Sequence, residues 1–134
     1  MIKLEDSERE IKIEDLITFE IENEITLPKS FKDFLMNSNG GYPEDDLFFG
    51  RYIIDGFNSI VYGDYHIQKI ISNLSGALPK KSIPFAHSNG GVIFMSLKTD
   101  DYEKVYIMYS DGQTDFLAES FEKFMNGLSK EQDL

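Results

Sequence analysis

Apolar residues recur at helical spacing in four parts of the chain. The clearest repeat has the i, i+3, i+4, i+7 stripe of a helix that faces a core, formed by Ile67, Ile70, Ile71 and Leu74. Asp64 precedes this stripe as a candidate N-cap, and Gly76 follows its end. The pattern therefore predicts a helix between these two residues.

Two more helices have both an apolar stripe and residues typical of helix ends. Ser120 is a candidate N-cap, although Lys123 stands where a capping box would have Glu or Gln, and the stripe that follows is Phe121, Phe124, Met125 and Leu128. Pro28 at a first helical position and Gly40 beyond the last one bracket a short helix with the apolar residues Phe31, Phe34 and Leu35.

The N-terminal segment carries two overlapping patterns. Helical spacing connects Ile13, Leu16, Ile17 and Ile21. Strand-like alternation with polar residues connects Ile17, Phe19, Ile21 and Ile25. We favour the helix.

Strand-like runs occupy most of the remaining chain, at residues 51–55, 59–62, 83–87, 92–97, 105–109 and 114–117. Asn89-Gly90-Gly91 between two of these runs is typical of a hairpin, because such turns need residues that tolerate positive φ. This order predicts an α+β fold with a single, mainly antiparallel sheet flanked by helices. We expect one domain over residues 1–134, with 1–10 as a flexible segment and 129–134 as a tail.

Composition narrows the class of protein. A chain of 134 residues that is 41% hydrophobic can bury a core without disulfides or metal staples. It contains no Cys, which excludes disulfides, thiolate zinc sites, Fe–S clusters and Cys nucleophiles. No apolar run approaches the length of a membrane span, and the N-terminus lacks the apolar stretch of a signal peptide. We therefore expect a cytoplasmic protein with no membrane partner.

Charge indicates the kind of partner. Lys and Arg number 13 against 24 Asp and Glu, a formal net charge of −11. Residues 1–28 and 44–65 are acidic, whereas residues 66–98 contain lysines and no carboxylate. Because nucleic-acid phosphates need basic side chains, we expect no nucleic-acid partner and instead a basic protein.

Sequence signatures of common enzymes are absent. The chain has no P-loop, no dinucleotide-binding glycine motif, no H-E-x-x-H and no G-x-S-x-G. Its two histidines, His66 and His87, lack the further ligands of a metal site, and Asp64 is the only convenient carboxylate. We expect no catalytic site, no cofactor and no metal, and a small hydrolase using Asp64 and His66 is disfavoured.

Acidic and tyrosine residues together form the candidate binding site. Tyrosines surrounded by carboxylates are typical of surfaces that bind basic proteins. The candidate partner-binding residues are Tyr42, Glu44, Asp45, Asp46, Tyr62, Asp64, Tyr65, Asp100, Asp101 and Tyr102. Solvated loops and ordinary packing of tyrosines on a sheet are the competing interpretations.

Five short motifs in order resemble the SUKH superfamily of Smi/Knr-like proteins. The first two are residues 25–35 (I-T-L-P-K-S-F-K-D-F-L) and 39–43 (N-G-G-Y-P). The later ones lie at residues 53–57 with 62–65, 83–86 with 89–91, and 120–124, so the resemblance covers about residues 11–128. It implies a helix over residues 13–24, a sheet flanked by helices and no enzyme activity. The chain has no Trp, where many members of the superfamily have one, so a contact that relies on an indole is in doubt here.

The resemblance also implies two alternative roles. Many bacterial members are immunity proteins of polymorphic toxin systems, which leads to the hypothesis of a protein that binds a cognate toxin domain, with a nuclease favoured, and neutralises it by occlusion. The alternative is a regulatory interaction module like the fungal regulators of cell-wall synthesis. The sequence leaves the oligomeric state open.

Overall fold

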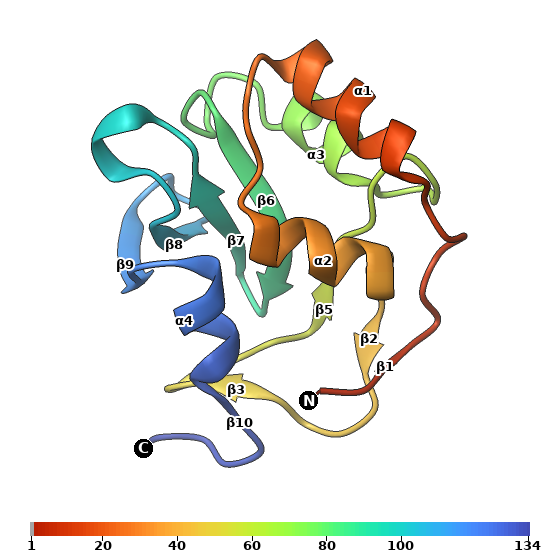
Figure 1. Ribbon diagram of the computed structural model, residues 1–134. Coiled ribbons are helices and arrows are strands. Elements are labelled where there is room, and N and C mark those ends of the chain that lie inside the picture. Colours follow the sequence, from red (N-terminus) through yellow and green to blue (C-terminus); the bar gives the residue numbers. More distant parts are fainter. Residues whose placement is uncertain (1) are drawn as a thin grey trace.

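The computed structural model describes residues 2–134, and its largest element is an antiparallel sheet of five strands (Figure 1). The strands lie in the order β5 (Gly56–Phe57), β6 (Ser82–Ser88), β7 (Gly91–Ser96), β8 (Val105–Tyr109) and β9 (Thr114–Ala118). β6 and β7 form the predicted hairpin. Gly90 in its turn has a φ of 78°, the conformation for which glycine is suited.

The prediction of a single sheet is wrong, because two smaller sheets accompany the main one. β1 (Leu4–Glu5) pairs with β2 (Tyr42–Pro43), and β3 (Phe48–Phe49) pairs with both β4 (Tyr52–Ile53) and β10 (Leu128–Ser129). β4 lies within the run predicted at residues 51–55, but the other four strands of these sheets were not predicted, because two residues are too short to produce an alternating pattern. The run at residues 59–62, predicted as a strand, is instead a bend that buries Ile60.

The described residues 2–134 also form four α-helices. They are α1 (Ile13–Asn23), α2 (Lys29–Asn37), α3 (Ile67–Asn73) and α4 (Phe121–Asn126), and a short 3₁₀-helix, η1, spans Thr99–Asp101. The interpretation of the N-terminal segment as a helix is thus confirmed.

The helix ends confirm one predicted cap and correct two. The Ser120 Oγ accepts a hydrogen bond from the Lys123 N–H at 3.1 Å, as expected for an N-cap. α3 is capped by His66, whose Nδ1 accepts from the Lys69 N–H, and not by Asp64, which lies two residues too early. Pro28 occupies the N-cap position of α2 rather than its first helical position.

A cluster of phenylalanines forms the centre of the core, between the main sheet and the helices α2 and α4. Phe85 on β6 meets Phe31 of α2 and Phe121 of α4 edge to face, with ring centroids 6.0 and 5.1 Å apart. Phe121 also lies 5.1 Å from Phe31, and Phe124 lies 5.3 Å from Phe85. These contacts fix both helices on the same face of the sheet.

Candidate functional site

The paired strands β1 and β2 form a short ribbon that is held against the edge of the main sheet. Gly41 exchanges two backbone hydrogen bonds with Phe57 of β5, at 3.0 and 2.8 Å. Gly40, with a φ of 73°, passes so close to the chain that an added Cβ would lie 2.7 Å from the Ser59 N atom. The glycines of the N-G-G-Y-P motif therefore allow the close approach that places Tyr42.

Asn39 fastens the start of this ribbon. Its buried side chain donates hydrogen bonds to the backbone oxygens of Arg9 and Ile60, at 2.9 and 3.0 Å, and accepts one from the Ile60 N–H at 2.8 Å. One amide thus connects three segments that are distant in the sequence. The sequence indicated Asn39 only as the first residue of the N-G-G-Y-P motif, because local pattern gives no signal for such a contact.

Three of the predicted binding residues line one hollow beside the ribbon. Tyr42, Asp64 and Tyr65 surround a space of about 460 Å³, which we call the tyrosine hollow. The tyrosine side chains are exposed, Tyr42 by 53% and Tyr65 by 72%. Asp6 and Glu8 add two carboxylates that sequence reasoning did not single out, and no Lys or Arg lines the hollow among the described residues.

His87 forms the inner wall of the tyrosine hollow. Its Nδ1 lies 3.1 Å from the Asn58 Oδ1, and burial lowers the pKa of His87, although the Asp55 carboxylate opposes this shift. A neutral imidazole is therefore favoured at neutral pH. Gly56 leaves the room that His87 needs, because an added Cβ would lie 2.8 Å from the imidazole Cε1.

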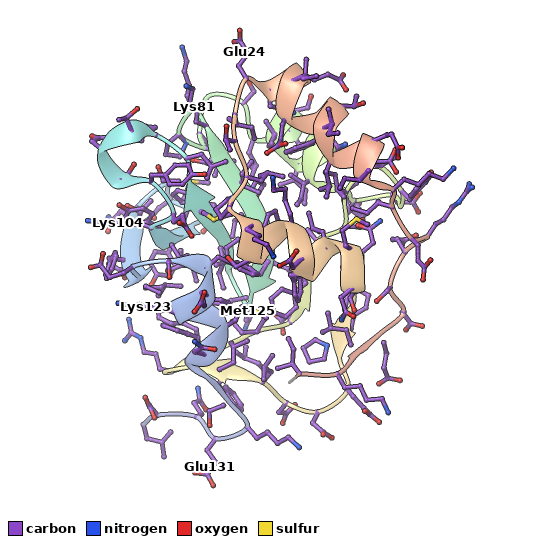
Figure 2. All side chains as sticks on the ribbon, in the orientation of Figure 1. Glu24, Lys81, Lys104, Lys123, Met125 and Glu131 are labelled. Carbon is purple, nitrogen blue, oxygen red and sulfur yellow. The ribbon has the colours of Figure 1, made fainter. Side chains whose placement is uncertain are left out.

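The predicted acidic residues Glu44, Asp45 and Asp46 lie on the other side of the ribbon. They line a larger hollow of about 920 Å³ between α2, α4 and the ribbon, which we call the helix hollow. Its other lining residues include the apolar side chains of Phe34, Leu47, Met125 and Leu128. Met125 is labelled on α4 in Figure 2.

Two of these acidic residues already have basic neighbours. Lys3 lies 3.5 Å from Glu44, and Lys130 lies 3.4 Å from Asp45, with all four side chains well exposed. Exposed pairs of this kind contribute about 0–1 kcal/mol, so a basic partner can replace the lysines at little cost. Asp46 makes no ion pair in the described part of the chain.

Residues 100–102 are not brought together with the other predicted residues. They lie in the loop that contains η1, at the opposite end of β6 from His87, and Figure 1 shows this loop far from the ribbon. Asp101 accepts hydrogen bonds from the hydroxyls of Ser96 and Tyr106. Burial raises the pKa of Asp101, but these hydrogen bonds and the charges of Lys98 and Lys104 together lower it. The Tyr102 hydroxyl donates to the Thr26 backbone oxygen at 2.6 Å.

Tyr62, another predicted binding residue, lines neither hollow and packs against the core. It is half-buried, and the guanidinium carbon of Arg9 lies 5.0 Å from the centroid of its ring. The preceding residue, Val61, has a φ of 69°, which is strained for a β-branched side chain. The Val61 N–H donates to the Gln68 side-chain oxygen at 3.1 Å, and this bond helps to hold the strained loop.

Neither a metal centre nor a membrane helix is found in residues 2–134. No group of three or more His, Asp or Glu side chains in this range is placed to hold a metal ion. None of the helices in this range combines the length and the apolar character that crossing a membrane requires. The Nδ1 of His66 is used in capping α3, so the pair Asp64 and His66 does not present a free imidazole at that atom.

A comparison with models of known protein families shows the family of this chain. The model of the SMI1 / KNR4 family (SUKH-1) matches residues 10–127. The chain therefore belongs to the SUKH-1 family, and the resemblance noted in its motifs is confirmed. No curated protein matches it. Membership of this family supports a role as a protein-interaction module.

Proposed function

We propose that this protein is an immunity protein that binds a cognate toxin domain, with a basic nuclease as the favoured class, and neutralises it by occlusion. The observation that carries this proposal is the surface on both sides of the ribbon. On one side, exposed Tyr42 and Tyr65 stand among carboxylates, and on the other, Glu44, Asp45 and Asp46 border an apolar hollow. Aromatic anchors, an apolar floor and an acidic rim are the features expected of a site for a basic protein.

Charge supplies the proposed mechanism. A nuclease needs a basic surface to attract phosphate, and an acidic inhibitor is attracted to the same surface. The net charge of −11 accelerates this encounter, and the ribbon then covers the surface that would bind the nucleic acid. The protein needs no chemistry of its own for this task.

Co-expression tests the proposal. The toxin domain encoded beside the gene for this chain is expressed with and without the protein, and growth and binding are both measured. We expect protected growth and a complex of the two purified proteins. Growth arrest in the presence of the protein, with no complex, would contradict the proposal. Binding to several unrelated proteins without protection would instead favour a regulatory interaction module.

A further inference from the structure

The outer face of α1 carries an apolar stripe that the fold does not use. Ile13, Ile17 and Ile21 are 61%, 49% and 71% exposed, although Leu16 and Phe19 on the opposite side of the same helix are buried. The three isoleucines are four residues apart, so they form one row about 12 Å long. Figure 1 shows α1 at the edge of the molecule.

Helix stability does not explain the choice of isoleucine. β-branched side chains lose rotamer freedom in a helix, and Ala, Glu or Lys would suit an exposed position better. Core packing does not explain it either, because Leu16 and Phe19 already anchor the helix. A contiguous exposed apolar row of this kind is typical of a surface that binds a partner.

The charges beside the stripe identify the chemistry of that partner. Residues 10–24 contain six acidic residues and one basic residue. Glu14 lies three residues before Ile17 on the helix, so its carboxylate borders the row. Glu24, the C-cap residue of α1, lines the same hollow as Ile21 and borders the other end of the row. Neither makes an ion pair with another residue of 2–134, whereas Glu20 is already bound to Lys32 and to the Leu27 N–H.

The same charges disfavour two other occupants. In a symmetric pair of α1 helices from two copies, acidic borders would face acidic borders, which repel each other. A membrane surface rich in anionic lipid would be repelled in the same way. A partner with apolar residues between lysines or arginines satisfies both the stripe and its borders.

A further hollow continues the stripe at the C-terminal end of α1. It has a volume of about 650 Å³ and is lined by Ile21, Ile25, Leu97 and Tyr102, among others. Figure 2 shows Glu24 and Lys81 projecting at this end of the molecule. The hollow offers space for one side chain of a partner that lies along α1.

We propose that the outer face of α1, from Ile13 to Ile21, is a docking surface for a basic amphipathic helix of a partner protein. The partner places apolar residues at i, i+3 or i+4, and i+7 against the isoleucine row, and its basic residues meet Glu14 and Glu24. This surface goes beyond the proposed function, because it uses no residue of the ribbon and requires no toxin.

A model peptide tests this docking surface. The probe is a labelled helical peptide of leucine and lysine, about 14 residues or roughly four turns long, with all leucines on one face. A second peptide of the same composition, with the leucines distributed around the helix, is the control. Binding to the full chain is measured by fluorescence anisotropy. We expect the amphipathic peptide to bind and the control peptide to bind at least about tenfold more weakly, because only the first presents an apolar face.

Variants of the chain assign the binding to α1. The double variant Ile17→Ser, Ile21→Ser is expected to keep its urea midpoint and to bind the amphipathic peptide at least about tenfold more weakly. The matched control is Phe116→Ser, since Phe116 is a similarly exposed apolar residue on β9. We expect this control to bind like the unaltered protein.

Three results would overturn the assignment. The first is that the double variant binds the amphipathic peptide as tightly as the unaltered protein. The second is that binding of this peptide is lost when Glu44, Asp45 and Asp46 are replaced by serine. The third is self-association in sedimentation, or co-sedimentation with anionic vesicles, that disappears in the double variant, because the occupant would then be a second copy or a membrane.

Discussion

Replacing Asn39 by aspartate tests how the ribbon is held in place. The change keeps the shape of the side chain but replaces the amide NH₂, which donates to the backbone oxygens of Arg9 and Ile60, by an oxygen. A carboxylate there would face two carbonyl oxygens without exposure to water. Burial and these neighbours therefore raise the pKa of the new carboxyl.

The magnitude follows from the geometry. The protonated carboxyl of the Asn39→Asp variant donates only one of the two hydrogen bonds, which costs about 1 kcal/mol. Taking about 6 for its folded-state pKa and about 3.9 for the unfolded chain, ionisation costs about 3 kcal/mol more at pH 7.5 but only about 1 kcal/mol at pH 4.5. Because the pKa of this carboxyl is raised in the folded state, the variant suffers no loss from ionisation below about pH 3.9, and it loses stability as the pH rises through about 6.

Urea unfolding at the two pH values measures this difference. Relative to the unaltered protein, we expect Asn39→Asp to lose about 4 kcal/mol at pH 7.5 and about 2 kcal/mol at pH 4.5. Asn89→Asp is the matched control, because Asn89 is exposed in a hairpin turn that accepts Asp equally well. An equal loss at both pH values, or a loss below about 0.5 kcal/mol, would refute the role of Asn39 as the buried fastening of the ribbon.

Three further predictions concern the core, the tyrosine hollow and the encounter with a partner. Phe121→Ala and Phe124→Ala should each lower the free energy of unfolding in urea by about 3–5 kcal/mol, whereas Glu122→Ala, at an exposed position, should lower it by under about 0.5 kcal/mol. Unchanged urea midpoints for both Phe variants would mean that α4 is not packed against the core. An NMR titration of His87 should give a midpoint below about pH 6.5, because burial lowers the pKa of the imidazole. The neutral imidazole therefore contributes to the stability of the fold above about pH 6.5, and this contribution is lost as the pH falls through the lowered pKa. A midpoint above about pH 6.5 would contradict the buried position of His87. Association with the toxin domain should slow markedly between about 0.05 and 0.5 M salt, because the Debye length falls from roughly 14 to 4 Å, and a rate independent of salt would exclude electrostatic steering.

The helices were predictable from sequence because each has an apolar stripe, but the pattern did not say what covers each stripe. In α1, the helical spacing includes both Leu16, which is buried, and Ile13, Ile17 and Ile21, which are exposed. Periodicity identifies apolar positions, and only the packing of the other elements decides which of them reach the core. In the two small sheets, β4 lies within the run predicted at residues 51–55, whereas the other four strands were missed because two paired residues leave no pattern.

The candidate site was predictable in its composition and not in its assembly. Acidic residues and tyrosines were recognised from charge and residue type, and Tyr42, Asp64 and Tyr65 do lie together. Their meeting depends on backbone bonds between Gly41 and Phe57, which are distant in the sequence. The loop at residues 100–102 has the same composition but lies at the other end of β6, and composition gives no information about that separation.

Binding of the toxin domain to a ribbon variant tests the central claim most directly. In this variant Glu44, Asp45 and Asp46 are all replaced by Ser. The control replaces Asp111, Glu119 and Asp133, three exposed carboxylates that line neither hollow, so that both variants lose the same charge. We expect both variants to unfold at nearly the urea midpoint of the unaltered protein. We expect the ribbon variant to bind at least about tenfold more weakly, or about 1.4 kcal/mol, and the control to change less. If the ribbon variant and the double variant Tyr42→Ala, Tyr65→Ala both bind and protect like the unaltered protein, the ribbon is not the surface that meets the toxin.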